Sequence, residues 1–188
     1  MIEVEVKIEL SEKELANLKE KIRKIAKYKK FEKKIDEYYT LQREGYPKKS
    51  LRIRRHGNLY EINFKNWISF SRSIHVKKET EFHVDKIQDF LALIKDFGYV
   101  FWLKKEKLCE IYEIEKNFHI ELNKVKHLGY FMEIEYLVKE NKDIEHARKR
   151  IEQTLSLLNL EKRKRIKSGY TKQLWKKYNG NEEILKRL

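Results

Sequence analysis

Cysteine, proline and glycine are all scarce in this chain, which has one cysteine, one proline and six glycines among 188 residues. The single cysteine, Cys109, excludes an internal disulfide and fits a reducing compartment. Pro47 is the only proline and no low-complexity linker is present, so we expect one domain, with or without a tail. No apolar run approaches a membrane-spanning length, and the charged start is unlike a signal peptide. These absences predict a cytoplasmic protein with no membrane partner.

Charged residues, by contrast, make up 39% of the chain and leave a formal net charge of +14. This excess of positive charge favours an anionic ligand, a nucleic acid or both as partners. From residue 161 to the end, basic residues interleave with aromatic ones. That segment has three possible roles: a basic helix closing one end of a site, a solvated tail, or a nucleic-acid-binding element.

The first ten residues alternate between apolar and charged, which is the period of a β-strand. One face carries Glu3, Glu5 and Lys7, and the other face is entirely apolar. Carboxylates two residues apart on a strand are about 6–7 Å apart at their Cα atoms, a spacing that suits a shared hard divalent cation. The alternative is an ordinary strand with one solvated face.

The same Glu-x-Glu pattern occurs on three predicted strands. The pairs are Glu3/Glu5, Glu79/Glu81 and Glu133/Glu135. Basic side chains share equivalent faces, namely Arg52, Arg54, Lys65, Lys77, Lys105 and Lys107. In a β-sandwich, these charged strand faces would lie on the outside. In a wide barrel they would point into the lumen, and helices would cover the apolar faces. A charged lumen is costly unless its charges compensate one another or hold ligands, which favours an anionic substrate with a divalent metal.

Three amphipathic helices are expected between the strands. Ser11 and Glu14 have the spacing of a capping box, and Asp85 and Asp143 are candidate N-caps of the later helices. Gly98 is expected at the end of the second helix. The first helix carries an apolar stripe of Leu15, Leu18, Ile22 and Ile25, the second Ile87, Phe90, Leu91, Ile94 and Phe97, and the third Ile144, Ala147, Ile151, Leu155 and Leu158. Strands are predicted at 1–10, 36–42, 50–56, 59–66, 75–84, 100–107, 110–115, 118–124 and 131–138.

The order of the motifs resembles that of the CYTH superfamily, which comprises the class IV adenylyl cyclases and thiamine-triphosphatases and is also called the triphosphate tunnel metalloenzymes. The motifs that carry the resemblance are Glu3-x-Glu5-x-Lys7, Asp36-Glu37-Tyr38-Tyr39, Leu51-Arg52-Ile53-Arg54, Lys65, Lys77-x-Glu79-x-Glu81, Lys105-x-Lys107, Leu122-Asn123-x-Val125, Leu128-Gly129-x-Phe131-x-Glu133-Ile134-Glu135 and Ser168-Gly169-Tyr170. Together they span nearly the whole chain.

This resemblance implies an α+β fold with an eight-stranded antiparallel closed β-barrel, a tunnel with flanking α-helices that binds a triphosphate lengthwise. It implies a tunnel domain over residues 1–170 and a basic C-terminal tail over residues 171–188. Mg²⁺ or Mn²⁺ would be the cofactor. The implied metal ligands are Glu3, Glu5, Glu79, Glu81, Glu133 and Glu135; the implied substrate-binding residues are Lys7, Arg52, Arg54, Lys65, Lys77, Lys105 and Lys107; and the implied catalytic residues are Glu5, Lys65 and Tyr38.

Three departures from the family pattern bear on the chemistry. Asn123 stands where aspartate is usual, and Lys77 and Lys107 stand where arginine is common. The resemblance allows triphosphate hydrolysis or cyclisation of ATP to cyclic AMP and pyrophosphate. Asn123 supports an alternative, a non-catalytic module that binds polyphosphate or nucleotide. Monomer and homodimer both stay open.

Overall fold

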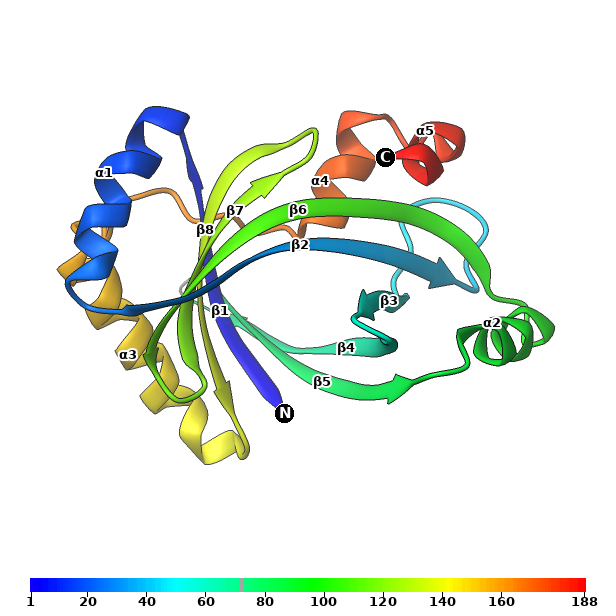
Figure 1. Ribbon diagram of the computed structural model, residues 1–188, viewed down its shortest axis with the longest axis horizontal. Coiled ribbons are helices and arrows are strands. Elements are labelled where there is room, and N and C mark those ends of the chain that lie inside the picture. Colours follow the sequence, from blue (N-terminus) through cyan, green and yellow to red (C-terminus); the bar gives the residue numbers. More distant parts are fainter. Residues whose placement is uncertain (72) are drawn as a thin grey trace.

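The computed structural model describes residues 1–71 and 73–188, and within them eight antiparallel strands form a closed barrel flanked by five α-helices (Figure 1). The strands are β1 (Ile2–Leu10), β2 (Lys27–Thr40), β3 (Leu51–His56), β4 (Leu59–Ser71), β5 (Ile74–Val84), β6 (Val100–Glu115), β7 (Phe118–Val125) and β8 (Gly129–Val138). The helices are α1 (Glu12–Arg23), α2 (Ile87–Asp96), α3 (Ile144–Leu157), α4 (Tyr170–Lys177) and α5 (Glu182–Arg187), and the 3₁₀ helix η1 (Asn141–Asp143) precedes α3. The predicted fold class is thus confirmed.

Strand β1 closes the barrel, because it pairs with β5 on one side and with β8 on the other. The order around the barrel is β1-β5-β4-β3-β2-β6-β7-β8. The register places Glu5 opposite Glu135 and Lys7 opposite Glu133. Side chains that lie opposite each other on antiparallel strands are close enough to interact, so this register brings distant charged motifs together.

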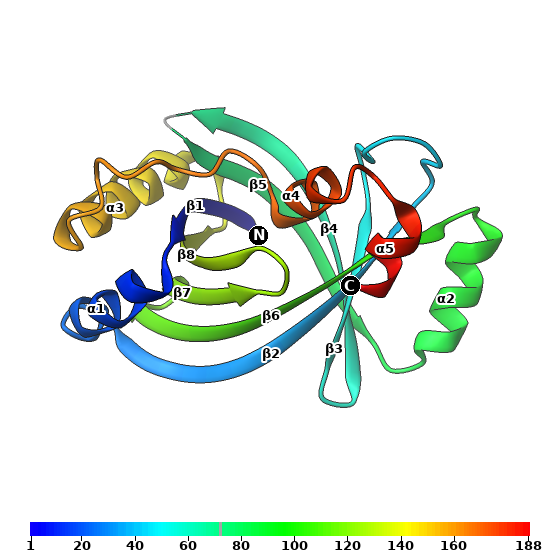
Figure 2. The same cartoon turned by 90° about the horizontal axis from the view of Figure 1, so that it is seen from above.

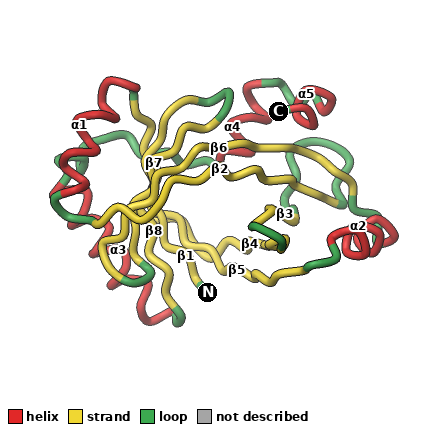
Figure 3. The backbone as a smooth tube through the Cα atoms, viewed as in Figure 1, coloured by secondary structure: helices red, strands yellow, loops and turns green. Residues whose placement is uncertain are grey.

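Helices α1 and α3 cover the outer, apolar face of the strands near β1 (Figures 1 and 3). Leu18 and Ile22 of α1 and Ile151 of α3 pack in one core with Val4 and Val6 of β1. Each fully buried aliphatic side chain stabilises the fold by about 1.5–3 kcal/mol. Since this face is covered by helices, the alternate charged face of β1 points into the barrel. The structure therefore has the wide-barrel arrangement and not the sandwich.

Two further helix groups cover other parts of the barrel. Helix α2 packs through Ile94 against Ile53 and Ile62, at the far end of the barrel from α1 and α3 (Figure 1). The C-terminal helices α4 and α5 lie over one side of the barrel (Figure 2), and Leu174 and Leu185 pack beside Trp102, Leu103 and Leu188 in a separate cluster.

The predicted helix ends are confirmed for α1 and partly wrong elsewhere. Ser11 and Glu14 form the expected capping box. The N-cap of α2 is Lys86, because Asp85 accepts a hydrogen bond from the adjacent Lys86 backbone instead of from the first helical turn. Asp143 is the N-cap of α3, but its side chain makes no capping hydrogen bond to any residue that the structure describes, since η1 leads directly into the helix with Asp143 already in a helical conformation.

Two other predictions about the second helix differ in outcome. Gly98 follows the C-cap residue Phe97 and has a φ of +88°, a conformation that glycine adopts without strain. Phe97, expected on the buried stripe, is 71% exposed. Phe97 lies at the C-cap, where the chain leaves the helix, so its side chain does not lie on the buried face of α2 with Ile94.

Four strand predictions are wrong in extent. The segments predicted at 100–107 and 110–115 are one strand, β6, and the strand predicted to start at residue 36 starts at Lys27. The strand predicted at 59–66 continues to Ser71 as β4. Residues 27–35 are rich in lysine and lack clean alternation, but they pair in register with β6 over most of their length. Long-range pairing therefore extends both strands beyond what local sequence indicates. In the described part of the chain, no helix has the length and apolarity to cross a membrane.

Candidate functional site

The barrel encloses a cavity of about 810 Å³ that is lined mainly by charged side chains. Every site residue predicted from the sequence lines this cavity. They are Glu3, Glu5, Lys7, Tyr38, Arg52, Arg54, Lys65, Lys77, Glu79, Glu81, Lys105, Lys107, Glu133 and Glu135. The alternation of each strand explains this result, because side chains at i and i+2 share a face and the helices occupy the opposite face.

Three carboxylates of this set lie close together. Glu3 and Glu5 of β1 and Glu135 of β8 each offer an oxygen, and these oxygens lie within 4.8 Å of one another. Glu3 and Glu5 are buried, and Glu135 is half-buried. Three converging carboxylates match the oxygen-rich donor set that Mg²⁺ and Mn²⁺ prefer, with water completing the shell.

Lysines hold two of these carboxylates. Lys77 Nζ lies 3.1 Å from Glu3 and also contacts Glu5, and Lys65 contacts Glu3 and Glu79. Burial alone would raise the pKa of Glu5, but Lys7 and Lys77 outweigh burial and lower it to about 2. Glu3, Glu5 and Glu79 are therefore paired inside the barrel, as a buried charge requires.

Glu135 differs from its neighbours. Within the described residues, its only basic partner is His119, whose Nε2 lies 3.5 Å away. Burial, followed by repulsion from Glu3, raises the pKa of Glu135 well above its usual range. A divalent cation between Glu3, Glu5 and Glu135 would supply the positive charge that Glu135 lacks, so these residues fit the metal that the family pattern implies.

The arginines occupy another part of the lumen. Arg54 donates two hydrogen bonds, of 2.6 and 3.0 Å, to the fully buried carboxylate of Asp36. Lys105 Nζ lies 2.8 Å from the same carboxylate, and Arg52 pairs with Glu61. Burial would raise the pKa of Asp36, but Lys105 and Arg54 hold it well below its usual range. This arrangement keeps two guanidinium groups and an ammonium group oriented within the lumen.

A third cluster joins β6, β7 and β8 through Lys107. Its Nζ lies 2.7 Å from Glu121 and 3.3 Å from Glu133, and Lys34 lies 2.8 Å from Glu121. Glu133 is therefore held by lysines, including Lys7 at 2.6 Å, and does not belong to the three-carboxylate group. The sequence-based reasoning missed Lys34 and Glu121. The signal for Glu121 was its place two residues before Asn123, on the same strand face.

Asn123 has a clear role in this cluster. Its Nδ2 donates hydrogen bonds to Glu133 at 2.7 Å and to Glu121 at 3.3 Å. An aspartate at this position would place a third carboxylate between two others and could donate no such bond. The amide thus joins two carboxylates that the usual aspartate would repel.

Two tyrosines complete the wall. The Tyr38 hydroxyl donates to Asp36 at 3.4 Å and accepts from Lys105 at 3.1 Å. The buried ring of Tyr170, the first residue of α4, lies 4.3 Å from Lys7 Nζ, a favourable cation–π distance. Helix α4 therefore contributes directly to the lumen, as a helix that closes part of the tunnel would.

Residues 1–170 match the family model described as the CYTH domain. A search of curated proteins found no match. Among solved structures, protein PH1819 from Pyrococcus horikoshii OT3 is 28% identical with a TM-score of 0.76, over 93% of this chain and 99% of that chain.

Two more distant structures share the fold. HpAC1 from Hippeastrum, named as an adenylyl cyclase with a dominant triphosphatase activity, is 15% identical with a TM-score of 0.65, over 95% of both chains. The triphosphatase of the Mimivirus capping enzyme is 15% identical with a TM-score of 0.56, over 84% of this chain and 89% of that chain.

Proposed function

Because this chain belongs to the CYTH domain family, we propose that it is a divalent-metal-dependent enzyme that acts on triphosphates, with hydrolysis of the terminal phosphate as its main reaction. One observation carries the proposal: the barrel lumen combines a three-carboxylate group with a lining of lysines and arginines. A triphosphate needs both features, because its own charge must be neutralised and its metal must be held.

The basic side chains of the lumen bind and orient the phosphates. Lys7, Arg52, Arg54, Lys65, Lys77, Lys105 and Lys107 are the proposed phosphate ligands. Each is now paired with a carboxylate, so a triphosphate would replace one set of anionic partners with another. The lumen is thus already organised for an anion, which lowers the cost of ordering side chains on binding.

Glu3, Glu5 and Glu135 would hold Mg²⁺ or Mn²⁺. Glu79 and Glu133 would act around them by orienting lysines, and Glu81 would act through water. The ion would neutralise phosphate charge and polarise a water molecule for attack. In the hydrolysis, the oxygen of water bonds to the terminal phosphorus while the bond from that phosphorus to the bridging oxygen breaks. The products would be orthophosphate and the diphosphate-containing remainder, with the water proton released to solvent. Lys65 would stabilise the transferred phosphoryl group, Glu5 would position the reacting centre, and the Tyr38 hydroxyl would donate to a phosphate oxygen.

Cyclisation of ATP is the second candidate. Trp67 lines the cavity beside Lys77 and is 57% exposed, so it offers an aromatic face on which a nucleobase could stack. In this reaction the ribose 3′-hydroxyl attacks the α-phosphorus and pyrophosphate leaves. The phosphate ligands would be the same in both reactions.

The test measures turnover of tripolyphosphate, thiamine triphosphate and ATP with Mg²⁺ or Mn²⁺, resolving orthophosphate, pyrophosphate and cyclic AMP. Glu135→Gln removes one proposed metal ligand, and we expect a loss of turnover on the order of a hundredfold because the metal is held less tightly. Glu140→Gln, an exposed glutamate outside the barrel, is the matched control and should leave turnover unchanged.

The products decide between the alternatives. Metal-dependent orthophosphate that Glu135→Gln abolishes supports the hydrolase, and cyclic AMP with pyrophosphate supports the cyclase. If the wild type forms no metal-dependent product beyond that of Glu135→Gln, the enzyme proposal is wrong. Tight triphosphate binding without turnover would then identify the non-catalytic binding module.

A further inference from the structure

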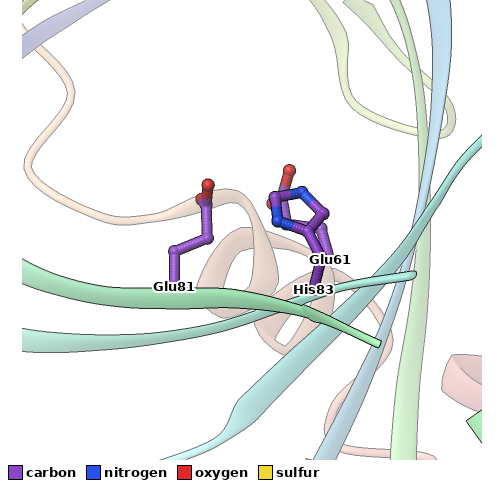
Figure 4. A group of neighbouring side chains, drawn as sticks. All are labelled: Glu61, Glu81 and His83. Atoms are coloured by element: carbon purple, nitrogen blue, oxygen red, sulfur yellow. The ribbon is translucent and has the colours of Figure 1, made fainter. Parts of the chain in front are cut away.

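A second group of possible metal ligands lies at the rim of the lumen, on β4 and β5. Donor atoms of Glu61, Glu81 and His83 lie within 4.8 Å of one another. Figure 4 shows their side chains projecting to the same side of the two strands. The register explains the grouping, because Glu61 lies opposite His83 and Asn63 lies opposite Glu81 on neighbouring rungs of the same face.

This group is separate from the three-carboxylate group. On β5, Lys77 lies opposite Glu3, and Glu81 follows four residues later. At the usual rise of a strand, four residues correspond to about 13 Å. An ion between Glu61, Glu81 and His83 would therefore not share the ligands of an ion between Glu3, Glu5 and Glu135.

The donors in this group are available. The contacts of Glu61 with Arg52 and Arg54 both use Oε1, which leaves Oε2 for another partner. Within the described residues, Glu81 has no basic side chain within ion-pair distance, and neither ring nitrogen of His83 has a hydrogen-bond partner. A carboxylate without a basic partner, next to an imidazole without a hydrogen-bond partner, is an arrangement that a cation would stabilise.

Asn63 provides an independent indication of a missing partner. Its side chain is 1% exposed, and its Nδ2 donates to Glu81 at 3.1 Å and to Glu79 at 3.3 Å. Among the residues that the structure describes, its buried Oδ1 has no hydrogen-bond partner. A buried amide oxygen without a partner is costly. The hydrogen bond from Nδ2 holds this amide next to the Glu81 carboxylate, so water bound to an ion at Glu81 could donate to Oδ1.

We propose that Glu61, Glu81 and His83, supported by Asn63, bind a divalent transition-metal ion at the rim of the lumen. One imidazole nitrogen and two carboxylates form a mixed donor set, which favours ions such as Zn²⁺ over Mg²⁺. The lumen would then hold two chemically different sites, one of oxygen donors only and one that includes nitrogen. Zn²⁺ binding at the rim site does not require the proposed catalytic reaction, although Glu81 is also one of the side chains proposed to act around the catalytic metal.

The experiment titrates the purified full chain with Zn²⁺ by calorimetry, in a large excess of Mg²⁺ that competes for oxygen-only sites. We expect one Zn²⁺ per chain in the wild type. His83→Ala and Glu81→Gln should each weaken Zn²⁺ binding at least about tenfold, because even the loss of a residue that only hydrogen-bonds to a metal ligand lowers metal affinity by that much. His146→Ala, an exposed histidine on α3, is the matched control and should bind like the wild type.

Glu135→Gln distinguishes the two sites. If it leaves Zn²⁺ binding intact while His83→Ala weakens it, the rim site is supported. If His83→Ala binds Zn²⁺ like the wild type, or if Glu135→Gln alone removes binding, the proposal is overturned. The measurement involves no triphosphate and no turnover, so its failure is distinct from a failure of the proposed enzymatic function.

Discussion

At the scale of single residues, the interior of this barrel is a set of buried charges that depend on one another. Asp36 is the clearest case, because its fully buried carboxylate is held by Arg54 and Lys105. Removing one partner of a buried ion pair leaves the others desolvated and uncompensated. Such residues therefore organise the lumen and also contribute to folding stability.

Asp36→Asn should lower the free energy of unfolding by about 3–5 kcal/mol at neutral pH, because it leaves Arg54 and Lys105 without their shared anion. Urea unfolding of the wild type and the variant measures this difference. Asp96→Asn, at the exposed end of α2, is the matched control and should change the free energy by no more than about 0.5 kcal/mol.

The pH dependence of that difference follows from the pKa of Asp36, which is lowered in the folded state. The contribution of the Asp36 carboxylate to the free energy of unfolding is fully present above its pKa in the unfolded chain, about 3.9. It is lost as the pH falls through its lower pKa in the folded protein. The gap between wild type and Asp36→Asn should therefore be constant from neutral pH to about pH 5 and shrink below about pH 4. A gap that widens on acidification would contradict this account.

At the scale of elements, the C-terminal helices extend the fold beyond the residues that match the family. The match ends at residue 170, but Leu174 of α4 and Leu185 of α5 are buried against Trp102 and Leu103. The division at residue 170 stays a prediction. Of the roles considered for residues 161–188, this packing favours a helix that closes one end of the site over a solvated tail. Nucleic-acid binding by this segment stays a prediction.

Leu185→Ala should lower the free energy of unfolding by about 2–5 kcal/mol, because it opens a cavity in the cluster around Trp102. Ile184→Ala is the matched control on the same helix, where the side chain is 40% exposed, and it should cost far less. Chemical denaturation of both variants measures the difference. Equal effects of the two substitutions would mean that α5 does not dock as described.

At the scale of the whole molecule, a net charge of +14 and a lumen rich in lysine and arginine favour small polyanions. A ligand that binds only the folded state stabilises it by mass action, by about 2.7 kcal/mol at one hundred times its dissociation constant. The proposed function therefore predicts a thermodynamic effect that needs no turnover.

Tripolyphosphate should raise the melting temperature of the protein in a concentration-dependent way, and the shift should decrease as salt screens the lumen charges. Differential scanning calorimetry with and without Mg²⁺ measures the shift. Sodium chloride at matched ionic strength is the control and should produce little of it. An equal shift with sodium chloride would show general screening of the positive charge instead of a specific site.

Much of the fold follows from local pattern. Alternation along β1 placed Glu3, Glu5 and Lys7 on one face, and the apolar stripes of α1 and α3 identified the helices that cover the other face. Every predicted site residue lines the cavity for the same reason. Their individual roles as ligands and catalysts stay predictions, as do the cytoplasmic location and the oligomeric state.

The sequence by itself determined which residues share a face, because strand and helix periods are local properties of the chain. Only the tertiary structure decided which faces meet. It extended β2 through a lysine-rich segment and placed Lys34 and Glu121 together. Within the described part of the chain, it also left Glu135 without a lysine partner of the kind that Glu133 has. These outcomes depend on strand register around the closed barrel, which joins residues far apart in the chain and which no local pattern specifies.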